Sequence, residues 1–278
     1  MKYWILIATF AVQLITLQAT ADELGALSIR GEWQQGGVLV GELEPGARVR
    51  FLGHDVSVSD DGHFVLGIGR DAPEQMSLEW WDAAGNYYSR SFDVQQRDYR
   101  IQKINGVPQR TVTPDPKHLK RIRAEVAMTK KARADITERT DFLEAFEWPL
   151  LGPITGVYGS QRYYNGQPRR PHYGVDVAAP TGTLVRAPAS GKVTLTHDDM
   201  YFSGGTLIVD HGHGLSSSFI HLSKILVTTG QEVEQGDAIA EVGATGRVTG
   251  PHLDWRMNWR DQRVDPTSLV PPMNSVRQ

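Results

Sequence analysis

The 278-residue chain contains no cysteine. This absence excludes disulfide bonds, thiolate zinc ligands and a cysteine nucleophile, so the folded protein must be stabilised by ordinary apolar cores. The chain also lacks a strong charge imbalance, because 29 basic residues against 32 acidic ones give a formal net charge of −3. Such a balance gives no global argument for a nucleic-acid partner, and we expect none.

Long apolar runs are also missing, apart from one at the N-terminus. A single lysine precedes the mostly apolar stretch 3–17, and Ala19-Thr20-Ala21 follows with the small-x-small pattern that suits signal peptidase. This pattern predicts a signal peptide over residues 1–21, export to the periplasm or cell envelope, and a mature protein that starts near Asp22. The weakly basic start leaves an uncleaved anchor open, and only in that case do we expect contact with the membrane.

The segment from Leu27 to Val94 consists of short alternating apolar and polar runs. Pro-Gly, Asp-Asp-Gly and Ala-Gly-Asn turns separate these runs. The pattern predicts a small antiparallel β-sandwich-like domain over residues 22–97. Its two histidines, His54 and His63, are isolated from other candidate ligands, and we expect them on the surface or on edge strands.

A linker with a helix is predicted over residues 98–147. Asp98 to Pro116 holds three prolines and resembles a connector. Residues 116–146 then carry apolar side chains at roughly helical spacing, at Leu119, Ile122, Val126, Ala132, Ile136 and Phe142. The many basic residues of this segment either form a solvated face or approach an anionic polymer.

The remaining residues, 148–278, are predicted to form an all-β domain, because short strands alternate with tight glycine turns and there is hardly any helix signal. The predicted fold class of the chain is therefore mostly β. This last domain contains six of the nine histidines. It is where we expect the chemistry.

Three places in this domain combine histidine with a carboxylate or with a strand: "HYGVD" (His172 to Asp176), "SFIHLS" (His221) and "HLD" (His252 to Asp254). Residues an even number apart on a strand project from the same face. Imidazole and carboxylate donors at about 2.0–2.2 Å are what zinc requires. Each pair alone is also compatible with a hydrogen-bonded structural pair.

Taken together and in order, "PHYGVDVAAPTGTLVRAPASGKV" and "GGTLIVDHGHGLSSSFIHLSKILVTTGQEVEQGDAIAEVGATGRVTGPHL" resemble peptidase family M23, the lysostaphin or LytM-type zinc endopeptidases. The resemblance covers about residues 148–266. It implies that His172 and Asp176 bind zinc and that His221 and His252 are catalytic. Phe219 stands where the family usually has tyrosine. Asp254 occupies the second position of the H-x-H motif, where the family has a metal-binding histidine.

The H-L-D sequence therefore departs from the family pattern at one ligand. Asp254 lies on the correct face, and a carboxylate is an accepted zinc ligand. Two carboxylates would make a zinc-bound water less acidic and the site less discriminating against Mn²⁺. His211 and His213, in "DHGHG", fall in a glycine-rich hairpin turn, and the family pattern assigns them no ligand role.

The resemblance implies a zinc-dependent endopeptidase that hydrolyses the peptide cross-links of bacterial peptidoglycan. His172, Asp176 and Asp254 would hold the zinc, while His221 and His252 would stabilise the tetrahedral intermediate and transfer protons. The alternative is a catalytically inactive M23-like domain that binds cell wall or activates an amidase. The expected partners are peptidoglycan peptide stems, with a cell-wall amidase or divisome protein under the alternative.

Overall fold

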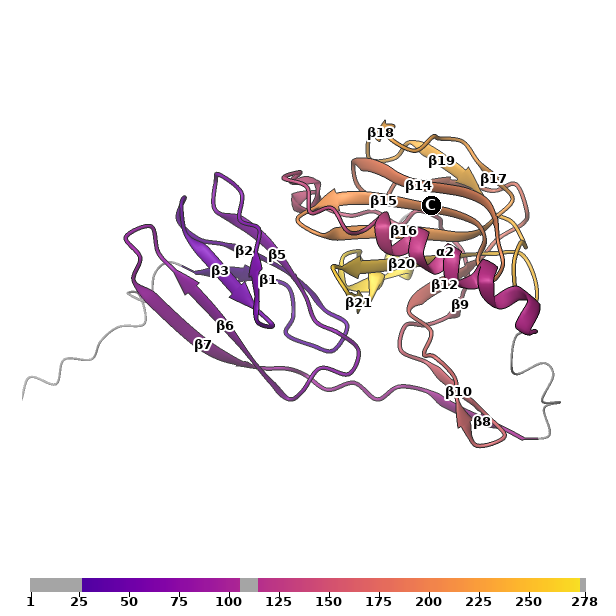
Figure 1. The fold of residues 1–278 in the computed structure, drawn as a ribbon, viewed down its shortest axis with the longest axis horizontal. Helices are drawn as coiled ribbons and strands as arrows, with labels where there is room; N and C mark the ends of the chain where they lie inside the picture. Colours follow the sequence, from indigo (N-terminus) through magenta and orange to yellow (C-terminus); the bar gives the residue numbers. More distant parts are fainter. Residues whose placement is uncertain (1–26, 106–114, 276–278) are drawn as a thin grey trace, which may run out of the picture.

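The computed structural model describes residues 27–105 and 115–275, and its elements are mostly β-strands, which confirms the predicted fold class (Figure 1). The predicted signal peptide, residues 1–21, lies outside the described residues. Among the residues that are described, no helix is long and apolar enough to cross a membrane.

The N-terminal part is built from two small antiparallel sheets. One has the order β1-β2-β5 and the other β4-β3-β6-β7. Strand β6 shows why this sequence forms such sheets, because exposed and buried side chains alternate along it and place Met76, Leu78 and Trp80 in the core. The strands are β1 (Ser28–Arg30), β2 (Val38–Glu42), β3 (Arg48–Phe51), β4 (His54–Val56), β5 (His63–Gly67), β6 (Gln75–Trp81) and β7 (Tyr87–Asp93).

The C-terminal part is organised around an eight-stranded sheet with the order β18-β14-β15-β16-β20-β12-β9, in which β21 also pairs with β20. A smaller sheet, β13-β19-β17, packs beside it. The strands are β9 (Ile154–Gly156), β12 (Gly174–Ala178), β13 (Leu184–Arg186), β14 (Gly191–Met200), β15 (Gly204–Gly212), β16 (Leu215–Leu222), β17 (Lys224–Ile225), β18 (Glu232–Val233), β19 (Ala238–Glu241), β20 (His252–Trp259) and β21 (Gln262–Val264). Short 3-10 helices η4 (Pro266–Ser268) and η5 (Met273–Ser275) follow the last strand.

The segment predicted as a connector contains a strand. Residues Ile101–Ile104 form β8, which pairs in parallel with β10 (Gln161–Tyr164) of the C-terminal part. Strand β10 continues into β11 (Gln167–Pro168) to form a hairpin. The connector is therefore attached to the peptide segment that precedes β12.

The predicted helix is real but shorter than its apolar spacing indicates. After η2 (Pro116–His118), the α-helix α2 runs only from Leu119 to Lys131, and the extension of the helix to Phe142 is wrong. Residues 132–140 do not continue the helix. The backbone carbonyl of Thr137 instead accepts a hydrogen bond from the amide of His213. Phe142 lies in a 3-10 turn, η3 (Asp141–Leu143), and is buried.

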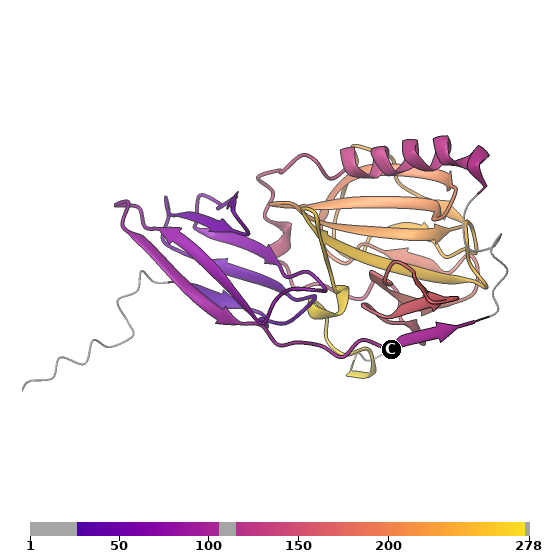
Figure 2. The same ribbon diagram turned by 60° about the horizontal axis from the view of Figure 1, so that its bottom comes forward.

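Helix α2 lies across one face of the large sheet (Figure 2). The Glu125 carboxylate accepts a hydrogen bond of 2.9 Å from the backbone amide of Tyr201, next to the β14–β15 hairpin. Arg121 forms ion pairs with Glu125 and with Asp199 of the same hairpin. The helix is thereby fastened to the sheet through its polar side chains.

The two β-rich parts share a packed contact at Trp259 of β20. The rings of Trp259 and Phe51 lie 5.9 Å apart between centroids, and a Cβ atom on Gly67 would lie only 2.5 Å from the Cβ atom of Trp259. Gly67 therefore allows β5 to approach the indole closely. An ion pair of 2.7 Å between the partly exposed Arg97 and the buried Asp265 adds a second contact near this junction.

Candidate metal centre

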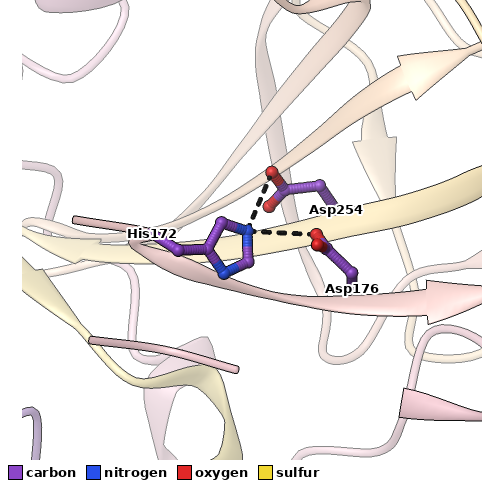
Figure 3. Close-up of side chains that lie close together, drawn as sticks. All are labelled: His172, Asp176 and Asp254. Carbon is purple, nitrogen blue, oxygen red and sulfur yellow. Dashed lines mark hydrogen bonds and ion pairs between the residues drawn. The ribbon is translucent and has the colours of Figure 1, made fainter. Parts of the chain in front are cut away.

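The register of the large sheet places three potential metal ligands side by side: His172, Asp176 and Asp254 (Figure 3). Asp176 of β12 is directly opposite Asp254 of β20, so their side chains leave the same face of the sheet. His172 precedes β12 and turns its ring toward both carboxylates. One donor atom from each residue lies within 4.8 Å of the other two.

The imidazole of His172 is oriented by a second contact. Its Nδ1 lies 3.2 Å from the carbonyl oxygen of Val157. A carbonyl can only accept, so Nδ1 carries the hydrogen and Nε2 faces the carboxylates. The Nε2 atom lies 3.0 Å from Asp176 Oδ1 and 3.4 Å from Asp254 Oδ2.

These three donors fit a divalent metal. Ligands at about 2.0–2.2 Å in a tetrahedral arrangement are separated from one another by roughly 3.3–3.6 Å. The distances from His172 Nε2 to the two carboxylates, 3.0 and 3.4 Å, are close to this value. Asp176 Oδ1 is buried, and its 3.0 Å contact with His172 Nε2 is an ion pair without hydrogen-bond alignment, so this oxygen accepts no hydrogen bond among the described residues. A buried carboxylate oxygen of this kind normally requires a hydrogen-bond donor or a cation. The arrangement is consistent with a bound metal.

The charges of the site are strongly coupled. Burial by itself lowers the pKa of His172, but its contacts with Asp176 and Asp254 raise that pKa to about 10. Asp254 is 2% exposed. Burial opposes its charge, but Arg256 and His172 hold the pKa of Asp254 well below its usual range. In the metal-free protein, His172 is therefore a cation between two carboxylates, in the place a metal ion would take.

The two predicted catalytic histidines lie beside these ligands. The rings of His221 and His252 are 5.0 Å apart between centroids, and His252 Nε2 lies 3.8 Å from Asp176 Oδ1. Each Nδ1 is 2.9 Å from a backbone carbonyl, of Thr245 for His221 and of Gly250 for His252. In both rings Nδ1 therefore carries the hydrogen and Nε2 is free to accept a proton.

His221 is held in an unusual backbone conformation. Its φ angle is +68°, in the left-handed region that residues other than glycine seldom adopt. The amide of His221 donates to the carbonyl of Ser203 at 2.8 Å, which fixes this conformation. Burial lowers the pKa of His221, so its ring is neutral near pH 7.

Arg256 is a residue of the site that the sequence analysis missed. It follows Asp254 by two positions on β20 and pairs with it through two contacts, Nε to Oδ1 at 2.9 Å and Nη2 to Oδ2 at 2.5 Å. Asp254 and Arg256 are two positions apart on a strand, so both side chains leave the same face, and this spacing could have identified Arg256 from the sequence. Gly174 of β12 leaves room for this pair, because a Cβ atom there would lie 2.5 Å from Asp254 Oδ1.

The histidines of the β15–β16 hairpin lie outside the metal cluster. His211 is buried, with Nδ1 at 2.7 Å from the Ser190 carbonyl and Nε2 at 2.8 Å from Ser217 Oγ. His213 is buried against the ring of Phe142, with centroids 4.8 Å apart. Both rings have packing roles.

Comparisons with known proteins show which family this chain resembles. The model of peptidase family M23 matches residues 170–266. A crystal structure of an M23 peptidase from Pseudomonas aeruginosa has 34% sequence identity and a TM-score of 0.68, and the alignment covers 86% of this chain and 95% of that one.

Two curated relatives match a shorter stretch. Peptidoglycan DD-endopeptidase ShyA of Vibrio cholerae is 41% identical over 105 residues, which are 38% of this chain and 24% of ShyA. DD-carboxypeptidase/endopeptidase Mpg of Neisseria meningitidis is 38% identical over 109 residues, which are 39% of this chain and 25% of Mpg. The matched segment thus spans about a quarter of the length of these relatives.

Proposed function

The chain belongs to peptidase family M23, and from that premise we propose that it is a zinc-dependent endopeptidase that hydrolyses the peptide cross-links of bacterial peptidoglycan. The observation that carries the proposal is the convergence of His172, Asp176 and Asp254 on one point, with His221 and His252 beside it. The names of ShyA and Mpg, both peptidoglycan or DD-peptide hydrolases, support the choice of substrate class.

The three ligands would hold the metal through one imidazole and two carboxylates. When bound, zinc supplies Lewis acidity that polarises a carbonyl group and acidifies water. The two carboxylates offset the charge of a divalent ion, so the site should also accept harder ions such as Mn²⁺. Arg256 keeps Asp254 ionised, and its two contacts fix the plane of that carboxylate.

His221 and His252 would handle protons and charge during hydrolysis. Their Nδ1 atoms are occupied by backbone carbonyls, so the Nε2 atoms are the ones available to substrate and water. A neutral Nε2 can accept a proton as a general base, and the resulting cation can stabilise the developing oxyanion. His221, neutral because of its burial, suits the first of these roles.

We also propose that the protein acts in the periplasm or cell envelope, where its substrate is located. The N-terminal β-sandwich would then be a targeting or regulatory module. The junction at Trp259 supports a regulatory role, because the sandwich packs directly against the strand that carries His252 and Asp254.

The test is the digestion of cross-linked muropeptides by residues 22–278 after zinc loading. We expect release of monomeric muropeptides, loss of this release with a chelator, and no release by a His252→Ala variant that keeps its metal. His197→Ala is a matched control, because His197 lies outside the metal cluster, and it should cleave like the wild type.

The inactive alternative makes a different prediction in the same experiment. A domain that only binds cell wall or activates an amidase should release no monomers, and His252→Ala should leave its binding or its amidase stimulation unchanged. That combination of results would overturn the proposed hydrolase.

A further inference from the structure

Three arginines gather on the metal-bearing face of the large sheet. Arg256 of β20 is directly opposite Ser218 of β16, so both side chains leave the face that carries Asp254. Arg133, from the segment after α2, reaches down to this face and donates to Ser218 Oγ at 2.7 Å. On the other side, Arg263 of β21 donates to Asn258 Oδ1 at 2.9 Å.

These arginines are close enough to repel one another. Burial, together with the charges of Arg263 and Arg256, lowers the pKa of Arg133 to about 9. Burial and the charge of Arg256 likewise lower the pKa of Arg263 to about 10. Both guanidinium groups still carry a charge near pH 7, so the cluster is a concentrated positive region.

The positive charge of the cluster is not balanced. Within the described residues, Arg256 has a carboxylate partner in Asp254, whereas Arg133 and Arg263 form no ion pair. The Nε atom of Arg133 is buried and has no hydrogen-bond partner in this part of the chain. The nearby acids, Asp176 and Asp254, are already committed to His172, Arg256 and the metal site.

A buried charge without a partner is unfavourable unless an opposite charge meets it. Guanidinium groups match carboxylates well, because their donors are planar and form paired hydrogen bonds. The side chain of Arg256 is 28% exposed, and Arg133 and Arg263 are also partly exposed, so a ligand can reach the cluster. The missing counter-charge is therefore best supplied by a molecule that binds at this face.

We propose that Arg133 and Arg263, arranged around Arg256, form a subsite for a carboxylate group of the peptide substrate. The inference rests on the proposed function, since it assigns a substrate group to that same site. Asp254 and Arg256 are two strand residues apart, or roughly 6.8 Å. An extended peptide covers this distance in about two residues.

The recognised carboxylate therefore lies within about two residues of the scissile bond. A substrate of a carboxypeptidase has such a group by definition, and the relative Mpg is named as a carboxypeptidase as well as an endopeptidase. If an endopeptidase substrate also carries a carboxylate next to the cleaved amide, the same arginines can bind carboxypeptidase and endopeptidase substrates.

The experiment compares two synthetic cross-linked peptides that differ only in this group, one with the free carboxylate next to the scissile bond and one with a carboxamide. For the zinc-loaded wild type we expect kcat/KM to favour the carboxylate by about 10- to 100-fold, the effect of one or two charge-assisted hydrogen bonds. In Arg263→Met and Arg133→Met this preference should fall below about threefold, mainly through a higher KM for the carboxylate peptide.

A binding measurement separates this subsite from the hydrolase proposal. Calorimetry with the carboxylate product peptide, on a background of His252→Ala, should show weaker binding when Arg263→Met is added and partial recovery with Arg263→Lys. Arg30→Met, an exposed arginine of β1, is the matched control and should change nothing. Melting temperatures of all variants check that they fold.

The outcomes are distinct. Equal cleavage of both peptides by the wild type, or an unchanged preference in both arginine variants, would overturn the subsite. If neither peptide is cleaved, the hydrolase proposal fails, and the binding data decide about the subsite alone. Arginine-dependent binding of the carboxylate peptide would then support it, and equal binding of both peptides would overturn it.

Discussion

Restoring the usual histidine at position 254 should destabilise this protein. The change Asp254→His removes the carboxylate that pairs with Arg256 and leaves a largely enclosed guanidinium group next to Arg133 and Arg263. A histidine at this position cannot accept the two hydrogen bonds that Asp254 accepts from Arg256. The family pattern at 254 and the arginine at 256 are therefore incompatible.

The magnitude follows from the burial of the pair. Removing one partner of a buried ion pair costs about 3–5 kcal/mol. The Asp254 side chain is only 3% exposed, but that of Arg256 is 28% exposed and can turn toward water. We therefore expect a value near the lower end, about 3 kcal/mol, which corresponds to a melting temperature lower by about 6–12 °C for a protein of this size.

The assay is calorimetric unfolding of the metal-free protein at neutral pH in the presence of a chelator. A double variant, Asp254→His with Arg256→Met, removes the unpaired cation and should recover most of the lost stability. Asp198→His, at an exposed position of β14, controls for the introduced imidazole. If Asp254→His is as stable as the wild type, and Arg256→Met adds nothing to it, the reasoning about the ion pair is refuted.

Three further predictions concern the metal and the catalytic histidines. Elemental analysis after zinc loading should find about one zinc per chain in the wild type and almost none in Asp254→Ala; equal zinc in both would remove Asp254 from the ligand set. In the metal-free protein the pKa of His172 is raised to about 10, so His172 must lose a proton to bind metal. The apparent zinc affinity, measured by competition with a chromogenic chelator, should therefore rise about tenfold per pH unit between about pH 6 and 8. A flat profile would contradict this. His221→Ala and His252→Ala should each lower kcat for muropeptide cleavage by about 10²- to 10⁴-fold while zinc content stays constant, and a loss of zinc would instead make them ligands.

Part of the candidate site was predictable from short-range rules, and part of it only from the resemblance to a known family. Strand alternation places residues two apart on the same face, and the glycine turns mark where strands end. His172, Asp176 and Asp254 do come together in the structure, but His172 and Asp254 are 82 residues apart, so their convergence was implied by the resemblance to family M23 and not by the alternation. The alternation also places Trp255 on the strand face that points away from His252, and Trp255 is fully buried in the core.

The rest of the site could not be predicted because it depends on contacts between distant parts of the chain. Arg133 and Ser218 are 85 residues apart in sequence, and neither carries a local motif. The end of α2 at Lys131 could not be predicted either, because it also depends on contacts with residues distant in the sequence. Apolar spacing favours a longer helix, but the hydrogen bonds of Thr137 to Asp210 and His213 hold the following segment in another conformation.

The segment from Arg133 to Thr137 has a practical consequence for dissecting this protein. A fragment limited to residues 170–266, the range matched by the family, would lose the partners of Ser218 and Asp210. It would also uncover Gly212, whose Cα now lies so close to the Arg139 carbonyl that a Cβ atom would be 1.7 Å from it. A shortened protein that keeps the contacts of the β15–β16 hairpin should therefore begin no later than about Pro116, because residues 133–139 pack on that hairpin.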